Sequence, residues 1–123
     1  LVHPNGTLDI TGTNHWNTFG TSTVDDVGFL SDLIDTIAAN YNVDLQRVYS
    51  TGMSNGGFMS FSLACQLSNR IAAIASVTGT MTNFNLNACV PERTVPIMQI
   101  HGTADATVPY DGNFLFTDVQ TLL

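Results

Sequence analysis

Ser54 lies between glycines in the segment "TGMSNGGF", residues 51–58, which fits the pattern Gly-x-Ser-x-Gly. Where a strand precedes this pattern and a helix follows it, the chain forms a nucleophile elbow, a tight turn that exposes a reactive serine hydroxyl. Ten of the 123 residues are glycine, so chance is the competing explanation. The elements around Ser54 must decide between a nucleophile and an ordinary turn.

The segments on either side of Ser54 have the character that the motif requires. Residues 47–52 are rich in β-formers and end in glycine, which predicts a strand. Residues 55–67 carry apolar side chains throughout and predict a largely buried helix. We therefore expect Ser54 to have a positive φ, and side chains at Gly52 and Gly56 to collide with neighbouring backbone. This setting favours a catalytic serine over a structural turn.

The remaining segments alternate between helix and strand. Apolar residues recur at helical spacing over residues 24–41, which predicts a helix with one buried side, capped by Ser22 or Thr23. Continuous apolar runs predict strands over 71–77 and 95–101. Irregular loops are expected over 3–23 and 80–94, and the start of a last helix over 117–123. The alternation predicts an α/β fold, a parallel sheet with helices on both faces.

A serine nucleophile needs a base, and the base needs an acid that orients it. In this architecture the chain order is serine, acid, histidine. Asp105 follows the third predicted strand, at the carboxyl end where ligands bind in open α/β sheets; its alternative role is to form a turn. The Asn55 N–H, at the start of a helix, can bind a developing oxyanion. An imidazole between Ser54 and Asp105 would hold the two side chains roughly 6–8 Å apart.

The catalytic base has no obvious candidate. His3, His15 and His101 all precede Asp105, so none fits the expected order. His101 ends a predicted strand, where a histidine packed against local backbone is expected. We expect neither His101 nor His15 to bridge the serine and the acid, and we expect the base to lie beyond Leu123.

Composition excludes several classes of function. The net charge is −7, with three arginines, no lysine and ten acidic residues, so nucleic acid is not an expected partner. No apolar run approaches the ~18 residues of a membrane span. Cys65 and Cys89 lack metal-ligand spacing, so no metal site is expected, and free thiols and a disulfide remain open. The missing lysines and the many Asn, Thr and Ser residues suit an extracellular protein.

Several longer segments, among them "DDVGFLSDLID", "YNVDLQRVYSTGMSNGGFMS", "NRIAAIASVTGT" and "HGTADATVPYDG", together give the chain a family resemblance. The chain resembles the α/β-hydrolase esterases grouped with polyhydroxybutyrate depolymerases and feruloyl or acetylxylan esterases. The resemblance implies a secreted serine esterase that cleaves small-molecule or polymer-linked carboxylic esters through an acyl-enzyme, without a metal or organic cofactor. It implies that Ser54 is the nucleophile and Asp105 the acid. It also implies that Cys65 and Cys89 pair, with Cα atoms about 4.4–6.8 Å apart.

The resemblance also sets expectations for the rest of the domain. Such esterases carry further strands upstream, with a loop that supplies a second oxyanion donor, and a downstream segment with the catalytic histidine. We therefore expect residues 1–123 to be the central segment of one α/β-hydrolase domain. The alternatives are a binding or structural protein that keeps the fold without a base, and a peptidase or lipase of the same fold. A histidine after a further strand beyond Leu123 would favour catalysis.

Overall fold

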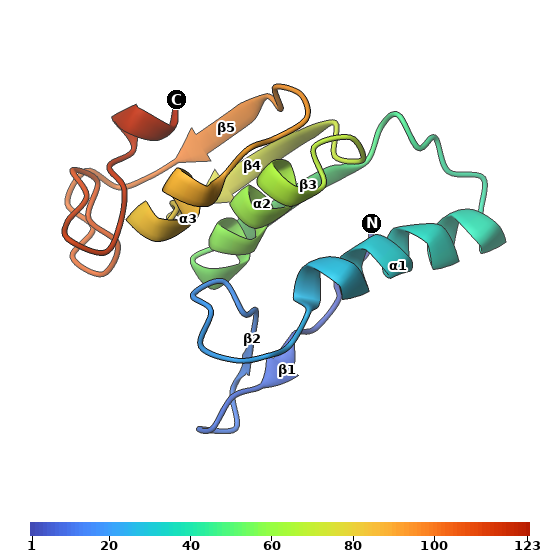
Figure 1. Ribbon diagram of the computed structural model, residues 1–123, viewed down its shortest axis with the longest axis horizontal. Helices are drawn as coiled ribbons and strands as arrows, with labels where there is room; N and C mark the ends of the chain where they lie inside the picture. The colour runs from blue at the N-terminus through green and yellow to red at the C-terminus, as the bar shows by residue number, and fades with distance from the viewer.

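A computed structural model describes residues 1–123, and its main feature is a three-stranded parallel sheet. The strands are β3 (Tyr49–Met53), β4 (Ala73–Val77) and β5 (Ile97–Ile100), in the order β3-β4-β5. Helix α2 (Asn55–Gln66) connects β3 to β4 and lies along both strands (Figure 1). The predicted α/β architecture is confirmed, and each strand begins slightly after its predicted start.

The hydrophobic core lies between α2 and one face of the sheet. Residues 57–64 of α2 are all buried, as the apolar run predicts. The core cluster consists of Met59, Phe61, Leu63, Ala64, Ile71, Ile74, Met81 and Val95. Burial of a large apolar side chain is worth roughly 1.5–3 kcal/mol. The contact of α2 with the sheet is therefore the main stabilising contact of the chain.

The opposite face of the sheet is open within residues 1–123. Side chains alternate along a strand, and those that point away from α2 are exposed. The large apolar ones are Tyr49, Met53, Met98 and Ile100, with 53–71 % of their surface accessible. The sequence predicts helices on both faces, but α1 (Asp26–Asn40) packs on the same side as α2. Its Val27, Leu30 and Ile34 contact the same core cluster.

Helix α1 begins after a different cap from the one predicted. Asp25, not Ser22 or Thr23, caps the helix, because its Oδ1 accepts the Gly28 N–H at 2.8 Å. A carboxylate at this position also complements the helix dipole. The Ser22 hydroxyl instead accepts the Val24 N–H at 3.3 Å, before the helix begins.

The apolar stripe of α1 is only half-buried. Side chains of α1, β3 and α2 line an open cavity of about 640 Å³. Elsewhere on the helix, the Arg70 guanidinium donates to the Ser31 carbonyl at 3.1 Å and pairs with Asp35. Arg70 lies between α2 and β4, so these contacts hold α1 to the strand–helix–strand unit.

The N-terminal segment contains a small hairpin where the sequence predicts irregular loop. Strands β1 (Thr7–Leu8) and β2 (Asn14–His15) pair antiparallel. The Asp9 carboxylate closes the turn between them, because its Oδ1 accepts the Thr11 N–H at 2.8 Å and the Thr13 N–H at 3.0 Å. In Figure 1 this hairpin lies beside the start of α2.

Two later segments also differ from prediction. The expected loop 80–94 contains a short helix, α3 (Asn83–Ala88), whose N-cap is Thr82: its hydroxyl accepts the Asn85 N–H at 3.1 Å. The expected helix start over 117–123 is a single 3₁₀ turn, η1 (Gln120–Leu122), since the Asp118 carboxylate accepts the Thr121 N–H and closes a local turn.

A disulfide joins the last turn of α2 to the end of α3. Cys65 and Cys89 are bonded, and their Cα atoms lie 5.5 Å apart, inside the range given above. Neither cysteine is free. No helix of the chain combines the length and the hydrophobicity that a membrane-spanning segment needs.

Candidate active site

Ser54 occupies a strained turn between β3 and α2. Its φ is 50° and its ψ −116°, the positive φ that the sequence predicts. A non-glycine residue keeps such a conformation only where its surroundings enforce it. The Ser54 N–H donates to the Val77 carbonyl of β4 at 2.8 Å, and the Ser54 carbonyl accepts the Phe58 N–H at 3.0 Å. The side chain caps nothing and is exposed, so its hydroxyl is free to react.

Glycines allow the elbow to pack against its neighbours. A Cβ on Gly52 would lie 2.4 Å from the Gly56 carbonyl carbon, and a Cβ on Gly57 would lie 2.4 Å from the Ser76 Oγ. The expected collision at Gly56 is wrong, because no atom lies within 4 Å of a Cβ built there. Gly56 borders the cavity beside α1, whereas Gly57 meets β4 and the turn at Gly79. Besides Gly52, the positions that have no room for a side chain are therefore Gly57 and Gly79, not Gly56 as the sequence predicts.

Asn55 attaches the elbow to a distant loop through its side chain. The Asn55 Oδ1 accepts the Trp16 N–H at 2.7 Å, and its Nδ2 donates to the Trp16 carbonyl at 3.0 Å and the Thr18 hydroxyl at 3.1 Å. The Asn55 backbone N–H, first in α2, has no carbonyl in its own helix to bond. One residue thus offers an N–H beside Ser54 and fixes the loop next to it. This second role has no sequence signal, because its partners lie far along the chain.

The loop that Asn55 holds carries an aromatic side chain to the first turn of α2. The ring of Phe19 lies 5.1 Å from that of Phe58 and 6.3 Å from that of Phe116. Phe58 is buried, while Phe19 keeps 42 % of its surface exposed. The Asn85 amide also binds this loop, at the Thr18 carbonyl, over 2.7 Å. An accessible aromatic surface therefore lies beside the elbow.

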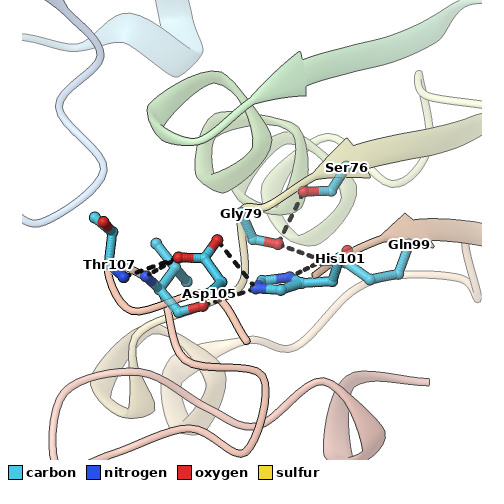
Figure 2. A network of polar contacts seen from close by, with 7 residues as sticks. Ser76, Gly79, Gln99, His101, Asp105 and Thr107 are labelled. Carbon is cyan, nitrogen blue, oxygen red and sulfur yellow. Dashed lines mark hydrogen bonds and ion pairs between the residues drawn. The ribbon is translucent and has the colours of Figure 1, made fainter. Parts of the chain in front are cut away.

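Asp105 forms the turn that follows β5. Its Oδ1 accepts the Val108 N–H at 3.0 Å and the Thr107 N–H at 2.8 Å (Figure 2). These two donors hold the pKa of the Asp105 carboxyl below its usual value. The Oδ2 makes no hydrogen bond. The turn-forming role that the sequence allows is thus present, and one carboxylate oxygen is left for a further partner.

The parallel sheet brings the two candidate catalytic residues to one edge. Ser54 directly follows β3, and Asp105 follows β5 after a short loop, with β4 between the two strands. Two strand spacings amount to roughly 10 Å. The separation of 6–8 Å between the two side chains stays a prediction.

None of the three histidines makes a hydrogen bond with the Ser54 side chain. The His101 side chain is 1 % exposed, and its nitrogens contact Gln99 and the Val108 carbonyl. His15 lies in β2 with a buried Nδ1 that has no hydrogen-bond partner, and His3 is exposed near the N-terminus. Nowhere do three or more His, Cys, Asp or Glu side chains gather in a way that could hold a metal ion.

Comparisons with known proteins agree with this geometry. Residues 20–120 match the family described as phospholipase/carboxylesterase. A bifunctional acetylxylan esterase/xylanase of Neocallimastix patriciarum is 36% identical over 89% of this chain and 15% of its own length. Feruloyl esterase D of Neurospora crassa is 35% identical over 68% of this chain and 28% of its own length. A poly(3-hydroxyoctanoate) depolymerase of Pseudomonas fluorescens is 29% identical over 76% of this chain and 36% of its own length.

The chain therefore spans only 15–36% of the length of these relatives. The names of the relatives cover the three kinds of esterase that the sequence resembles, so the resemblance is confirmed. The family match covers most of the chain and includes the elbow, the parallel sheet and the Asp105 turn. The chain belongs to the phospholipase/carboxylesterase family of α/β-hydrolases.

Proposed function

We propose that the protein containing this chain is a serine carboxylic-ester hydrolase in which Ser54 is the nucleophile and Asp105 the triad acid. The observation that carries the proposal is the conformation of Ser54. A strained serine with a free hydroxyl stands at the carboxyl edge of a parallel sheet, at the start of a helix. Strain of this kind persists in proteins mostly where a function uses it.

The reaction follows from the groups at this edge. The Ser54 oxygen attacks the ester carbonyl while a histidine takes its proton, and the Asn55 N–H stabilises the oxyanion that forms. The intermediate collapses when the same histidine protonates the departing alcohol, which leaves an acyl-enzyme. Water then attacks the acyl group by the same path and frees Ser54. The ionised Asp105 orients the imidazole and stabilises its charged form.

The base in this proposal is a histidine outside residues 1–123, and these residues are the central segment of the domain. Two observations support this view. The His101 ring is buried and engaged by Gln99 and Val108, while the Asp105 Oδ2 remains without a hydrogen bond. The family relatives are also several times longer than the matched region.

The substrates in this proposal are feruloyl, acetyl or polyhydroxyalkanoate esters, small or polymer-linked. The named activities of the relatives support these classes. The protein would work outside the cell, because a disulfide persists in oxidising compartments and is rare in the cytosol.

The test compares the full-length protein with its Ser54→Ala variant on a short-chain p-nitrophenyl ester. Loss of a triad serine lowers kcat by about 10⁶-fold in a hydrolase of this mechanism. Circular dichroism should show that the variant is folded, since the Ser54 side chain makes no hydrogen bond. Residues 1–123 alone should show no hydrolysis above background.

Three results would contradict the proposal. Equal activity of the full-length protein and its Ser54→Ala variant would remove Ser54 from the reaction. Absence of any esterase activity in the folded full-length protein would favour a binding or structural role on the hydrolase fold. Ser54-dependent turnover by residues 1–123 alone would place the base on His3, His15 or His101 instead.

A further inference from the structure

We propose that His101 is a positioning residue, held as a neutral imidazole with its proton on Nε2, and that it fixes the loop of Asp105 relative to β4. The proposal depends on the proposed function, because it assigns His101 a role in placing the triad acid. His101 is the one buried titratable side chain at this edge of the sheet that the reaction itself does not use. Figure 2 shows the chain of contacts that passes through it.

The proton positions in this network follow from the partners. The Val108 carbonyl can only accept, so the His101 Nε2, 2.7 Å away, must carry a proton. The Gly79 carbonyl can also only accept, so the Gln99 amide nitrogen must face it, at 2.8 Å. The same nitrogen lies 2.9 Å from the His101 Nδ1 and has a second hydrogen to donate. The His101 Nδ1 is therefore the acceptor, and the ring is neutral.

The orientation of the Gln99 amide supports this assignment. Its Oε1 is buried and has no hydrogen-bond partner. Reversal of the amide would put this oxygen against the Gly79 carbonyl, two acceptors in contact. The observed orientation leaves the Gln99 Oε1 unpaired but keeps both hydrogen bonds of the amide nitrogen, to Gly79 and to His101. These two hydrogen bonds therefore outweigh the cost of the unpaired oxygen.

The network connects the loop of the acid to the turn beside the nucleophile. Gly79 lies in the turn after β4, and its carbonyl also accepts the Ser76 hydroxyl at 2.9 Å. A Cβ on Gly79 would lie 2.7 Å from the backbone of Gly57, so this turn is in direct contact with the first turn of α2. The contacts run from α2 through Gly79, Gln99 and His101 to Val108.

At its far end the network sets the position of the carboxylate. The Val108 carbonyl accepts from His101, and the Val108 N–H donates to the Asp105 Oδ1 at 3.0 Å. The His101 Nε2 lies 3.8 Å from the Asp105 Oδ2, too far for a good hydrogen bond. His101 thus holds the peptide on which Asp105 rests and leaves the Oδ2 without a hydrogen bond.

A matched pair of substitutions in the full-length protein tests this role. In His101→Gln the amide nitrogen reaches the place of Nε2 and can still donate to the Val108 carbonyl. In His101→Asn the shorter amide reaches only the place of Nδ1 and leaves the Val108 carbonyl without its donor. We expect His101→Asn to lower kcat by ~10²-fold, the effect of a small displacement in an active site, with KM within about twofold. His101→Gln should retain kcat within about fivefold of the unchanged protein.

Two further measurements keep the test decisive if His101→Asn fails to fold. Long-range ¹H–¹⁵N spectra of the histidine-labelled full-length protein at neutral pH should show His101 as the Nε2–H tautomer. Gln99→Leu, which removes the donor to Nδ1, should disturb that tautomer and lower kcat by ~10-fold. Gln46→Leu, at an exposed glutamine far from the network, should change neither.

The outcomes separate the two proposals. Equal kcat for His101→Gln and His101→Asn, or a charged or Nδ1–H ring in the spectra, would overturn the role of His101. If hydrolysis by the unchanged protein does not depend on Ser54, the proposed function fails and the role of His101 fails with it. The tautomer measured in the same sample then shows whether the network itself is correct.

Discussion

The elbow at residues 53–57 and the acid loop at residues 101–108 leave the same edge of the sheet but are held in different ways. The elbow is fixed by its main chain: a positive φ at Ser54, a backbone hydrogen bond to Val77, and glycine contacts too close for a side chain. The acid loop is fixed by side chains, the carboxylate of Asp105 and the ring of His101.

This difference predicts how each region responds to change. A turn held by its backbone has no titratable group to lose, and an added Cβ disrupts it outright. A loop held by side-chain acceptors can be adjusted by a single conservative substitution, and it depends on the charge of its carboxylate. Four experiments, ordered from the largest expected effect to the smallest, examine the comparison.

The acid loop allows its two roles to be separated. Asp105→Asn keeps an acceptor for the Thr107 and Val108 N–H groups but loses the charge that a catalytic imidazole needs. We expect kcat of the full-length protein to fall by about 10⁴-fold, as when a triad aspartate becomes asparagine. The thermal midpoint should barely change, whereas Asp105→Ala should lower both. A loss below tenfold in Asp105→Asn would leave Asp105 as a turn former only.

The elbow should not tolerate a methyl group on its strand side. Gly52→Ala places a Cβ 2.4 Å from the Gly56 carbonyl carbon, so backbone must move, at an expected cost of about 3 kcal/mol in unfolding free energy. Gly56→Ala is the matched control, because its Cβ meets nothing within 4 Å and alanine favours a helix. Urea denaturation of both variants gives the comparison. Equal stability of the two variants would show that close backbone packing at Gly52 does not constrain the elbow.

The side chain of Asn55 is the one side-chain support of the elbow. Asn55→Ala leaves the Trp16 N–H and carbonyl without their partners, and we expect a loss of about 2 kcal/mol in unfolding free energy. Thr18→Val removes only the third contact and should cost about 1 kcal/mol. A double-mutant cycle measured by urea denaturation should show coupling between the two positions. Additive losses would mean that Asn55 does not hold this loop.

The smallest effect is a dependence on pH that the acid loop has and the elbow lacks. The folded-state pKa of Asp105 lies below its unfolded value of about 3.9, because the Val108 and Thr107 N–H groups stabilise the charged form. The contribution of the ionised Asp105 to folding stability is therefore complete above about pH 4, and it disappears as the pH falls through the folded-state pKa. The stability difference between the unchanged protein and Asp105→Ala should shrink over this range, because the carboxylate loses its charge. The stability difference between the unchanged protein and Ser54→Ala should not depend on pH. If both stability differences declined in parallel, the contrast between the elbow and the acid loop would be wrong.

The elbow could be predicted from sequence because its constraints are local. Glycines two residues either side of Ser54 mark the turn, although the sequence could not show that Gly57 rather than Gly56 is the crowded one. Chain order and the position after a predicted strand both point to Asp105, and the turn that the sequence allows there is present after β5. The contacts of the Asn55 and Gln99 side chains could not be foreseen, because they arise only when the fold brings distant backbone carbonyls into reach.

The errors in the fold have similar causes. Helix α3 is six residues long and contains three asparagines, which favour caps and turns over helix interiors, so its sequence suggests a loop. The sequence predicts Ser22 or Thr23 as the cap of α1, but Asp25 also has a side chain that can cap, and its contact with Gly28 shows that the helix begins there. Continuous apolar strands predict burial on both faces, yet Met53, Met98 and Ile100 are exposed.

The hydrogen bond from Ser54 to Val77 also sets an order in time. Val77 is the last residue of β4, which the ribosome makes only after α2 and the turn that follows it. While the nascent chain lacks β4, the Ser54 N–H has no Val77 carbonyl to bind, and one of the contacts that enforce its positive φ is missing. The strained turn at Ser54 is thus complete only when β4, the third element of the strand–helix–strand unit, has docked against β3.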